Sequence, residues 1–467
     1  MAFLGKLVLP AAESDRFGAI DPLDSRYYDP EISKYLSERS RIACQAYVEA
    51  ALAKALADFS VCSPKVAKDV EDGSKKVTAE AVYIEEQTTK HDIKALVNCI
   101  KAELPEASKP YVHFGATSYD IISTATALQL RLATNELVLP RLKTLLETLL
   151  KLTKEHSGTL QIGRTHGQHA LPITFGFATA EYVSRLGESM ITLKALSDNL
   201  TGKFSGAVGA YNALSVFVSD PISFEKTLLG YVGLKPAPYS TQIIPAENII
   251  RLLDELAITA GIMANLSHDM RHLQRTEIAE VRERFEKGQT GSSTMAHKRN
   301  PWNFENVISM SKQVTAQIVN ANLNISSEHQ RDLTDSASSR FYTIILASVA
   351  SMADRLNRVM GRLEVDPGNM ERNLHLTNGA IAAEPLYLLL EKYGHITAHE
   401  KSKELSHAAL AKALPLYEVL KKDRDAAPYF KQFTLKERRL IENPEAMYSG
   451  LASAKAMSVH DFWLKKF

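Results

Sequence analysis

The sequence has few cysteines and no long apolar run. Its 467 residues include three cysteines, Cys44, Cys62 and Cys99, without C-x-x-C spacing. So sparse a set makes neither a disulfide framework nor a zinc site, and it favours a reducing compartment. No segment approaches the roughly 18 consecutive apolar residues of a membrane span. The apolar N-terminal stretch is too short for a signal peptide, so we expect a cytoplasmic protein.

An excess of charge of one sign is also missing. Lys and Arg together number 55, Asp and Glu 54, and the formal net charge is +1. Without a basic block or stripe, neither nucleic acid nor a membrane is expected as a partner. Metal-ligand spacing, a dinucleotide glycine fingerprint and a Walker loop are absent too, so we expect no metal and no cofactor. A small anionic ligand needs only local charge and is compatible with this balance.

Helical periodicity dominates what is present. The leucines at 142, 145, 146, 149 and 150 repeat on one helical face. Asp29 followed by Pro30 is typical of the start of a helix. Strand-like alternation is weak throughout. The chain is therefore expected to be all-α, with a central bundle of five long helices near 117–156, 173–201, 245–286, 302–324 and 335–363.

Two breaks in this pattern predict three domains. One lies near ELPEASKPYVHFGATS, and the other is VDPGNM, where Pro367 and Gly368 stop the preceding helix. We expect an N-terminal helical domain at 1–114, the bundle at 115–366 and a C-terminal helical domain at 367–467.

Polar clusters recur where the long helices are expected to break. Each one alone has a structural explanation, since Thr117 or Ser118 can cap a helix, His91 can be a cap or surface residue, and His169 can bond within its loop. Five such clusters in an otherwise regular chain indicate a shared site instead. They are TTKHDIKAL, YVHFGATSYD, QIGRTHGQHALPITFG, GSSTMAHKRNP and QRDLTDSASSR.

The last cluster permits a specific interpretation. With Thr334 or Asp335 as the N-cap, Ser336 lies in the first helical turn, and Arg340 lies four residues further on the same face. Arg331 is in the approaching loop. Two guanidinium groups and a hydroxyl beside free N–H groups would suit a phosphate. A capped helix with an exposed arginine fits these residues equally well.

GSSTMAHKRNP suits chemistry by side chains alone. Its Gly-Ser-Ser amides can hold an oxyanion, while Lys298 adds a positive charge and Asn300 adds donors. Such a loop can stabilise the negative charge that develops on a carboxylate when a proton leaves the neighbouring carbon. A serine alkoxide held among those amides can remove that proton, and a histidine from another cluster can protonate the leaving group.

These motifs resemble the fumarase/aspartase superfamily, whose members eliminate fumarate without a metal. GSSTMAHKRNP is similar to its G-S-S-x-M-P-x-K-x-N-P signature, and GRTHGQHALPITFG and GATSYDIISTA are similar to its other two signature regions, in the expected order. Ala296 stands where the superfamily usually has proline. The lost restriction of φ is expected to loosen the loop without changing its chemistry.

Within the superfamily the chain most resembles the adenylosuccinate lyases. SRYYDPEI, TKHDIKAL, STQIIPAEN and NPWNFEN carry this resemblance, and Arg331, Ser336 and Arg340 match its phosphate-binding residues. It implies His166 as general acid, Ser292 as general base, and Lys298 and Asn300 as binders of the succinyl carboxylates. It also implies a substrate site lined by Arg26, Tyr27, Lys90, His91, Asp92, Thr117, Ser118, Thr165, Gln242, Ser293, Arg299 and Asn306. The implied reaction releases fumarate from two nucleotide substrates of purine synthesis.

Three other interpretations compete. Carboxymuconate cycloisomerases have a very similar signature loop, but their substrate has no phosphate and leaves Arg26, Tyr27 and the arginine pair unexplained. Argininosuccinate lyases usually have M-P-Q-K-K-N-P in this loop. A former lyase that now serves as a structural protein is disfavoured because both His166 and Ser292 are retained.

Helix length bears on assembly. A helix from Ser118 to about residue 156 spans roughly 60 Å if Pro140 only kinks it, and the His166 loop follows its far end. One chain therefore cannot easily bring Ser118 and His166 to one small substrate. The resemblance implies a homotetramer in which each site combines loops from three chains.

Overall fold

The computed structural model describes residues 20–285, 288, 294–295 and 297–467. They divide into two compact units. The first unit contains the described residues up to Leu142 together with Ser189–Gly261 and Ser309–Ala353. The second contains Lys143–Glu188, Ile262–Ile308 and Asp354–Phe467. The three-domain boundaries expected after residues 114 and 366 stay a prediction.

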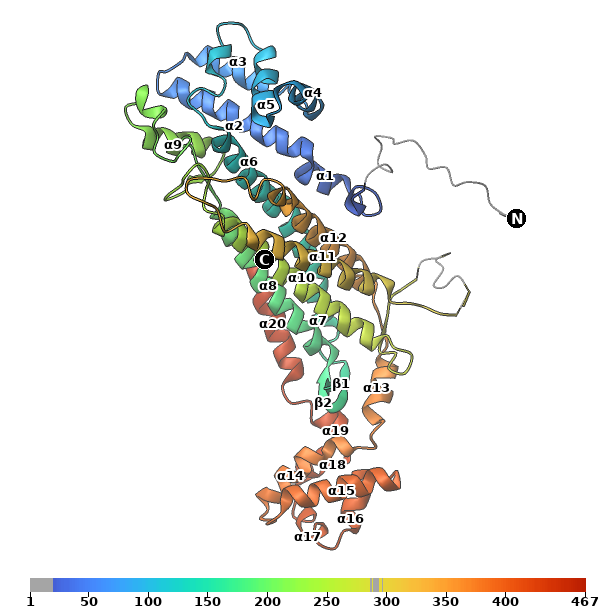
Figure 1. Ribbon diagram of the computed structural model, residues 1–467. Coiled ribbons are helices and arrows are strands. Elements are labelled where there is room, and N and C mark those ends of the chain that lie inside the picture. The colour runs from blue at the N-terminus through green and yellow to red at the C-terminus, as the bar shows by residue number, and fades with distance from the viewer. Residues whose placement is uncertain (1–19, 286–287, 289–293, 296) are drawn as a thin grey trace, which may run out of the picture. The chain divides into compact units, whose positions relative to one another are not determined.

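The predicted long helices are present (Figure 1). The five leucines from Leu142 to Leu150 are all buried, as their spacing predicts. Pro140 does not end its helix, because a π turn at Thr134–Val138 precedes it and the helix continues. The long helices are α6 (Ser118–Ala133) continued by α7 (Leu139–Glu155), α8 (Phe175–Asp198), α10 (Glu247–Leu273), α11 (Trp302–Leu323) and α12 (Tyr342–Met360).

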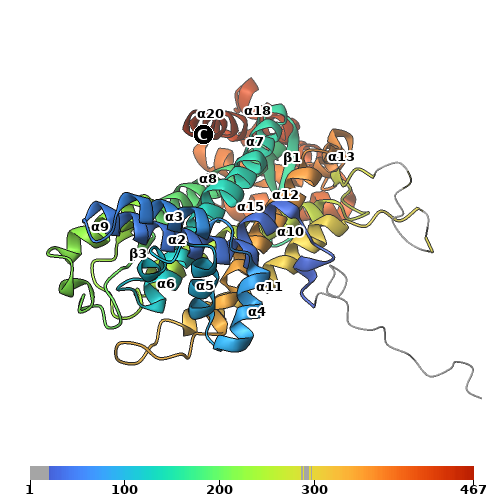
Figure 2. The same cartoon turned by 90° about the horizontal axis from the view of Figure 1, so that it is seen from above.

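In the first unit, α2 (Glu38–Asp58) is the central helix. It contacts α3 (Pro64–Ser74), α6 and α9 (Pro221–Tyr231), which lie beside it in both ribbon views (Figures 1 and 2). Val48, Leu52 and Leu56 of α2 are fully buried, and the alanines between them allow close packing. The same unit also contains α1 (Pro30–Leu36), α4 (Ala79–Thr89), α5 (Asp92–Ala102) and the short parallel strands β3 (Thr201–Gly202) and β4 (Lys235–Pro236).

Asp29 caps α1 as predicted. Its carboxylate accepts hydrogen bonds from the backbone N–H groups of Glu31 and Ile32, and Pro30 occupies the first helical position. Proline costs nothing there because that N–H has no helical partner.

The second unit contains an antiparallel hairpin that the weak strand pattern did not predict. Its strands are β1 (Leu160–Thr165) and β2 (Gln168–Thr174), and β1 contacts α13 (Pro367–His375). A pair of two-residue strands, β5 (Val281–Arg282) and β6 (Glu364–Val365), lies in the same unit. Five of its C-terminal helices share a buried cluster of leucine, isoleucine, alanine and phenylalanine. They are α14 (Ala383–Lys392), α15 (Ala398–Lys412), α16 (Leu416–Lys422), α17 (Ala427–Phe430) and α18 (Leu435–Glu442), and the short helix α19 (Pro444–Met447) follows them.

The last helix, α20 (Ala452–Lys466), packs Trp463 against Gly187 of α8. A β-carbon built on Gly187 would lie 2.5 Å from the indole ring, so only glycine fits under the tryptophan. Lys143 also donates a hydrogen bond of 2.9 Å to the carbonyl of Phe467. The C-terminus is therefore fixed to helices from much earlier in the chain.

Two predicted helix boundaries are wrong. The helix expected over 245–286 ends at Leu273, because Ala279 has a φ of 53° and the N–H of Glu280 returns to the carbonyl of Leu273. The helix expected from 335 begins at Tyr342, after the short 3-10 helix Ser338–Phe341.

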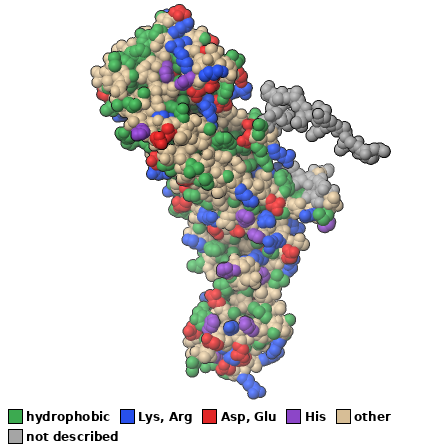
Figure 3. All heavy atoms as spheres, in the orientation of Figure 1, with side chains coloured by type: hydrophobic (Ala, Val, Ile, Leu, Met, Phe, Trp, Pro, Cys, Tyr) green, Lys and Arg blue, Asp and Glu red, His purple; other side chains and the backbone are tan. Residues whose placement is uncertain are grey.

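Within the described residues, no helix combines the length and apolar character needed to cross a membrane. Acidic and basic side chains are intermixed on the face drawn in Figure 3. This agrees with the nearly balanced charge of the sequence.

Candidate active site

His166 lies at the tip of the β1–β2 hairpin. Thr165 pairs with Gln168, so His166 and Gly167 form a two-residue turn, with φ angles of 54° and 74°. Such turns need left-handed backbone at both positions, and histidine adopts it more readily than most residues. The turn exposes the imidazole, where it can meet a ligand.

The base of this hairpin is fixed by a buried carboxylate. Glu280 is fully buried and accepts hydrogen bonds from Arg164 and Gln161 of β1 and from Asn373 of α13, at 2.6 to 3.2 Å. Donors from two elements of the fold thus hold this carboxylate in one position. The strand that leads into the His166 turn is therefore held at several points.

His169 faces Arg164 across the hairpin. Among the described residues, its buried Nδ1 has no hydrogen-bond partner, and burial together with Arg164 lowers the pKa of the imidazole. The neutral form is therefore favoured at this position.

Part of the signature loop lies outside the described residues, including Ser292, Ser293 and Ala296. Among the described residues of the loop, the Lys298 N–H donates a hydrogen bond of 3.0 Å to the Met295 carbonyl. The Arg299 guanidinium lies 5.7 Å from the ring centroid of Phe285. Asn300 precedes Pro301, and Asn306 lies in the second turn of α11. The second unit thus carries Thr165, His166, Lys298, Arg299, Asn300 and Asn306.

Glu283 connects the chain before the signature loop to the start of α11. Its buried carboxylate accepts hydrogen bonds of 3.0 Å from the backbone N–H groups of Asn303 and Phe304, and its own N–H bonds to Gln274. Burial raises the pKa of Glu283 despite these donors. The contact caps α11 with an acid, which opposes the positive end of the helix dipole.

In the first unit the starts of α5 and α6 meet. His91 caps α5 and Thr117 caps α6, where it forms a capping box with Asp120. The Nε2 atom of His91 lies 3.5 Å from Oγ of Ser118, the first residue of α6. Both helix ends carry partial positive charge, so their meeting point favours an anion.

Two arginines border this meeting point. Arg340 lies 3.7 Å from Asp92, and its side chain is 51% exposed. Arg331 is almost fully buried, pairs with Asp335 at 2.7 Å, stacks 4.1 Å from the Tyr119 ring centroid and donates to its hydroxyl. One arginine is thus accessible to a ligand, while the other is held in place.

The predicted capped helix over 335–340 is not formed. The Asp332 carboxylate accepts bonds from the N–H and hydroxyl of Thr334, which closes a local turn, and Asp335 pairs with Arg331 instead of capping. Ser336 lies in that turn, and its N–H bonds to the Leu333 carbonyl. The positive helix ends near the arginines are those of α5 and α6.

Four further predicted residues lie in the first unit. Arg26 and Tyr27 follow a short 3-10 helix and precede α1, and Arg26 is exposed. Lys90 ends α4 in a left-handed conformation, with a φ of 51°. The Gln242 N–H donates to the Gln330 carbonyl at 3.3 Å, which places Gln242 beside the segment that carries Arg331.

Tyr119 and Asp335 were missed as partners of Arg331. Tyr119 directly follows Ser118, but a tyrosine near the start of a helix carries no sign that it stacks on an arginine more than two hundred residues later. Burial is the main reason why the pKa of Tyr119 is raised, and its hydroxyl therefore stays protonated at neutral pH.

Comparison with known proteins identifies the family. A lyase family model matches residues 24–316, and a model of the adenylosuccinate lyase C-terminal region matches 327–435. The adenylosuccinate lyase of Pyrococcus abyssi is 37% identical over 444 residues, which cover 91% of this chain and 97% of that protein. That of Helicobacter pylori strain J99 is 33% identical over 403 residues, 85% of this chain and 87% of that protein.

The chain belongs to the adenylosuccinate lyase family. The resemblance inferred from the signature motifs is confirmed.

Solved structures place this adenylosuccinate lyase family member in the fumarase/aspartase fold. The 3-carboxy-cis,cis-muconate lactonizing enzyme of Pseudomonas putida superposes with a TM-score of 0.83 at 26% identity, over 95% of this chain and 100% of that chain. A fumarate lyase from Mesorhizobium sp. BNC1 gives a TM-score of 0.82 at 24% identity, over 93% and 98%. The predicted all-α fold is confirmed.

Proposed function

We propose that this chain is a C–N lyase that splits adenylosuccinate into AMP and fumarate. The equivalent succinylated aminoimidazole carboxamide ribotide of purine synthesis is its second substrate. The main observation behind this proposal is that two helix N-termini meet at His91 and Ser118. Arg331 and Arg340 lie beside them. This arrangement supports binding of the phosphate that both nucleotides share.

The elimination needs a base, an acid and a carboxylate-binding group. Ser292, as an alkoxide, takes the proton from the succinyl carbon next to the carboxylate that Lys298 and Asn300 bind. The electron pair of that C–H bond forms the C=C bond of fumarate, and the C–N bond breaks. His166 gives its proton to the leaving nitrogen, which becomes the amino group of AMP. The exposed imidazole on an anchored hairpin supports the role of acid.

The remaining substrate contacts are assigned to the residues of both units. Arg26, Tyr27, Lys90, Asp92, Thr117, Gln242 and Ser336 of the first unit, and Thr165, Arg299 and Asn306 of the second, complete the site together with Ser293. Placing nucleotide-binding residues at helix starts and loops suits a ligand that must enter and leave.

Assembly and location follow the same proposal. The enzyme is a homotetramer in which three chains contribute to each site, and it acts in the cytoplasm on soluble nucleotides. The length of the helical run formed by α6 and α7, which separates Ser118 from the His166 turn along the chain, supports a shared site.

Ultraviolet absorbance tests the function directly. Purified protein mixed with adenylosuccinate should change the absorbance as AMP and fumarate form, and chromatography should find the two products in equal amounts. A flat trace with folded protein would favour a cycloisomerase or a lyase that has become a structural protein. Assay with 3-carboxy-cis,cis-muconate then separates these two.

A further inference from the structure

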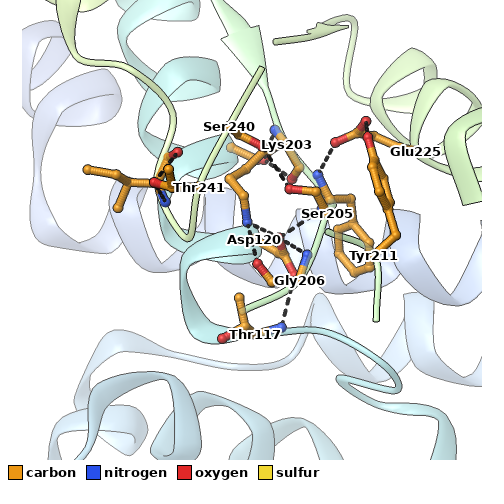
Figure 4. A network of polar contacts seen from close by, with 12 residues as sticks. Thr117, Asp120, Lys203, Ser205, Gly206, Tyr211, Glu225, Ser240 and Thr241 are labelled. Atoms are coloured by element: carbon orange, nitrogen blue, oxygen red, sulfur yellow. Dashed lines mark hydrogen bonds and ion pairs between the residues drawn. The ribbon is translucent and has the colours of Figure 1, made fainter. Parts of the chain in front are cut away.

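A buried ion pair lies under the start of α6. Asp120 and Lys203 are both fully buried, and Lys203 Nζ donates to Asp120 Oδ1 (Figure 4). Removing two charges from water is costly unless further hydrogen bonds satisfy them. The contacts around this pair therefore show what it holds together.

Asp120 joins two segments. Its Oδ2 accepts the N–H of Thr117 at 2.9 Å, and its Oδ1 accepts the N–H groups of Ser205 and Gly206, each at 3.2 Å. Lys203 also donates to the Gly206 carbonyl at 3.2 Å. One carboxylate thus fixes the cap of α6 to the 203–206 segment (Figure 4).

The backbone of Lys203 strengthens this connection. Its N–H donates to the Thr124 hydroxyl at 3.1 Å, and that hydroxyl donates to the Lys203 carbonyl at 2.9 Å. Thr124 lies on α6 and is fully buried. The first two turns of the helix are therefore tied to the 203–206 segment independently of the ion pair.

The 203–206 segment continues the connection to Gln242. The hydroxyls of Ser205 and Ser240 are 2.7 Å apart, and both residues are buried. A β-carbon on Gly209 would lie 2.0 Å from the Ser240 carbonyl oxygen, so the two segments are in close backbone contact. Ser240 is two residues before Gln242.

We propose that Asp120 and Lys203 are positioning residues of the substrate site. They touch no substrate themselves. They fix the positions of Thr117 and Ser118 at the start of α6. Through Ser205 and Ser240 they also fix the position of Gln242. The inference rests on the proposed function, because it takes these three residues as substrate contacts. Breaking the connection displaces them relative to one another and weakens substrate binding.

Ser205→Ala tests one link of this network in a variant that keeps every bond of Asp120. Ser402→Ala is the matched control, since Ser402 is an equally buried serine whose hydroxyl donates one bond, of 2.6 Å, to the Ala383 carbonyl. Loss of one hydrogen bond corresponds to about a fivefold change in a binding constant. We expect Ser205→Ala to raise KM for adenylosuccinate about that much with kcat nearly unchanged, and Ser402→Ala to leave KM alone.

The ion pair itself is tested by Asp120→Asn/Lys203→Met. Removing both charges avoids the unpaired buried charge that either single substitution leaves, so the double variant should fold. A misplaced binding residue can reduce kcat/KM roughly 100-fold, and here the loss should lie mainly in KM. Calorimetric titration with AMP should give a matching rise in Kd.

Three results decide between the inference, a purely structural role and a failure of the proposed function. If both variants lose thermal stability but keep the wild-type KM and AMP Kd, the network only supports the fold and the inference is wrong. Wild-type protein that does not cleave adenylosuccinate would overturn the proposed function instead. Raised KM in the network variants, with unchanged KM in Ser402→Ala, supports positioning.

Discussion

The Glu280 carboxylate receives both ends of the Arg164 guanidinium, with N···O distances of 2.6 and 3.2 Å. Arg164 is on β1, two residues before His166 in the turn that follows this strand. This bidentate contact fixes the direction of the strand as well as its position. The orientation of the proposed general acid thus depends on a residue that is fully buried behind it.

Glu280→Gln should therefore impair both stability and turnover. The amide cannot accept from all of the donors around it, and Arg164 loses its counter-charge. We expect the free energy of unfolding, measured by urea titration, to fall by about 3 kcal/mol. We also expect a lower kcat with little change in KM. Glu155→Gln is the control, because the Glu155–Lys151 pair is exposed and 3.8 Å long. An unchanged kcat in folded Glu280→Gln would show that the hairpin does not depend on this contact.

Ser292→Ala should abolish most turnover and leave substrate binding nearly intact. Loss of a general base costs roughly 10² to 10⁴ in rate, while Lys298 and Asn300 still bind the succinyl group. Single-turnover kinetics and the Kd for adenylosuccinate measure the two effects. If the specificity constant fell through weaker binding alone, Ser292 would be a binding residue.

Arg340→Ala should weaken AMP binding much more than adenosine binding. Arg340 is half exposed beside the α5 and α6 starts, and only AMP offers it a charged partner. A charge-assisted hydrogen bond accounts for roughly a 10- to 100-fold change in Kd, which calorimetric titration can resolve. Arg358→Ala removes a similarly exposed arginine of α12 and should change neither affinity. Equal weakening for both ligands would leave Arg340 without a phosphate role.

Two inactive variants should restore activity when their chains mix. His166→Asn removes the acid but keeps the left-handed turn, because asparagine tolerates positive φ. Co-refolded with Ser292→Ala, roughly one site in four should receive both intact groups if the loops come from different chains. Native mass spectrometry confirms the mixing. Mixed tetramers without activity would contradict the shared site.

His113 should make stability depend on pH. Burial alone would lower its pKa, but the Glu49 carboxylate, 2.6 Å from Nδ1, outweighs burial and raises the pKa. The folded pKa of His113 exceeds the unfolded value of about 6.5. The stability that the protonated His113 gains from Glu49 is therefore fully present below about pH 6.5. It is lost as the pH rises through the folded pKa.

Urea titrations from pH 6 to pH 9 check this. The stability difference between wild type and His113→Asn should shrink as the pH rises, and asparagine keeps the φ of 63° at this position. A difference that stays constant over this range would show that the ion pair contributes nothing.

Features set by local sequence were predictable. The Asp29–Pro30 cap, the buried leucine face of α7 and the start of α11 follow from capping chemistry and helical spacing, and all three are confirmed. The same local reasoning failed at 335, because Asp335 has a more favourable partner in Arg331 than in the helix end.

Features set by distant partners could not be predicted. The hairpin of His166 is too short for the alternation of its residues to stand out in the sequence. Its two-residue loop between Thr165 and Gln168 contains a glycine, which is a signal for a hairpin. Asp120 and Lys203 are charged residues of a kind that is rarely buried, and nothing near either one in the sequence identifies the other. The family motifs located the candidate residues, but not the contacts beneath them.

The packing of Trp463 on Gly187 has a consequence for folding during synthesis. The chain emerges from the ribosome N-terminus first, so the surface of α8 around Gly187 is made long before the last helix that covers it. Closing so long a loop is entropically costly and slow. The second unit therefore cannot complete its core until α20 has been made, and until then the surface of α8 around Gly187 lacks the indole ring that covers it.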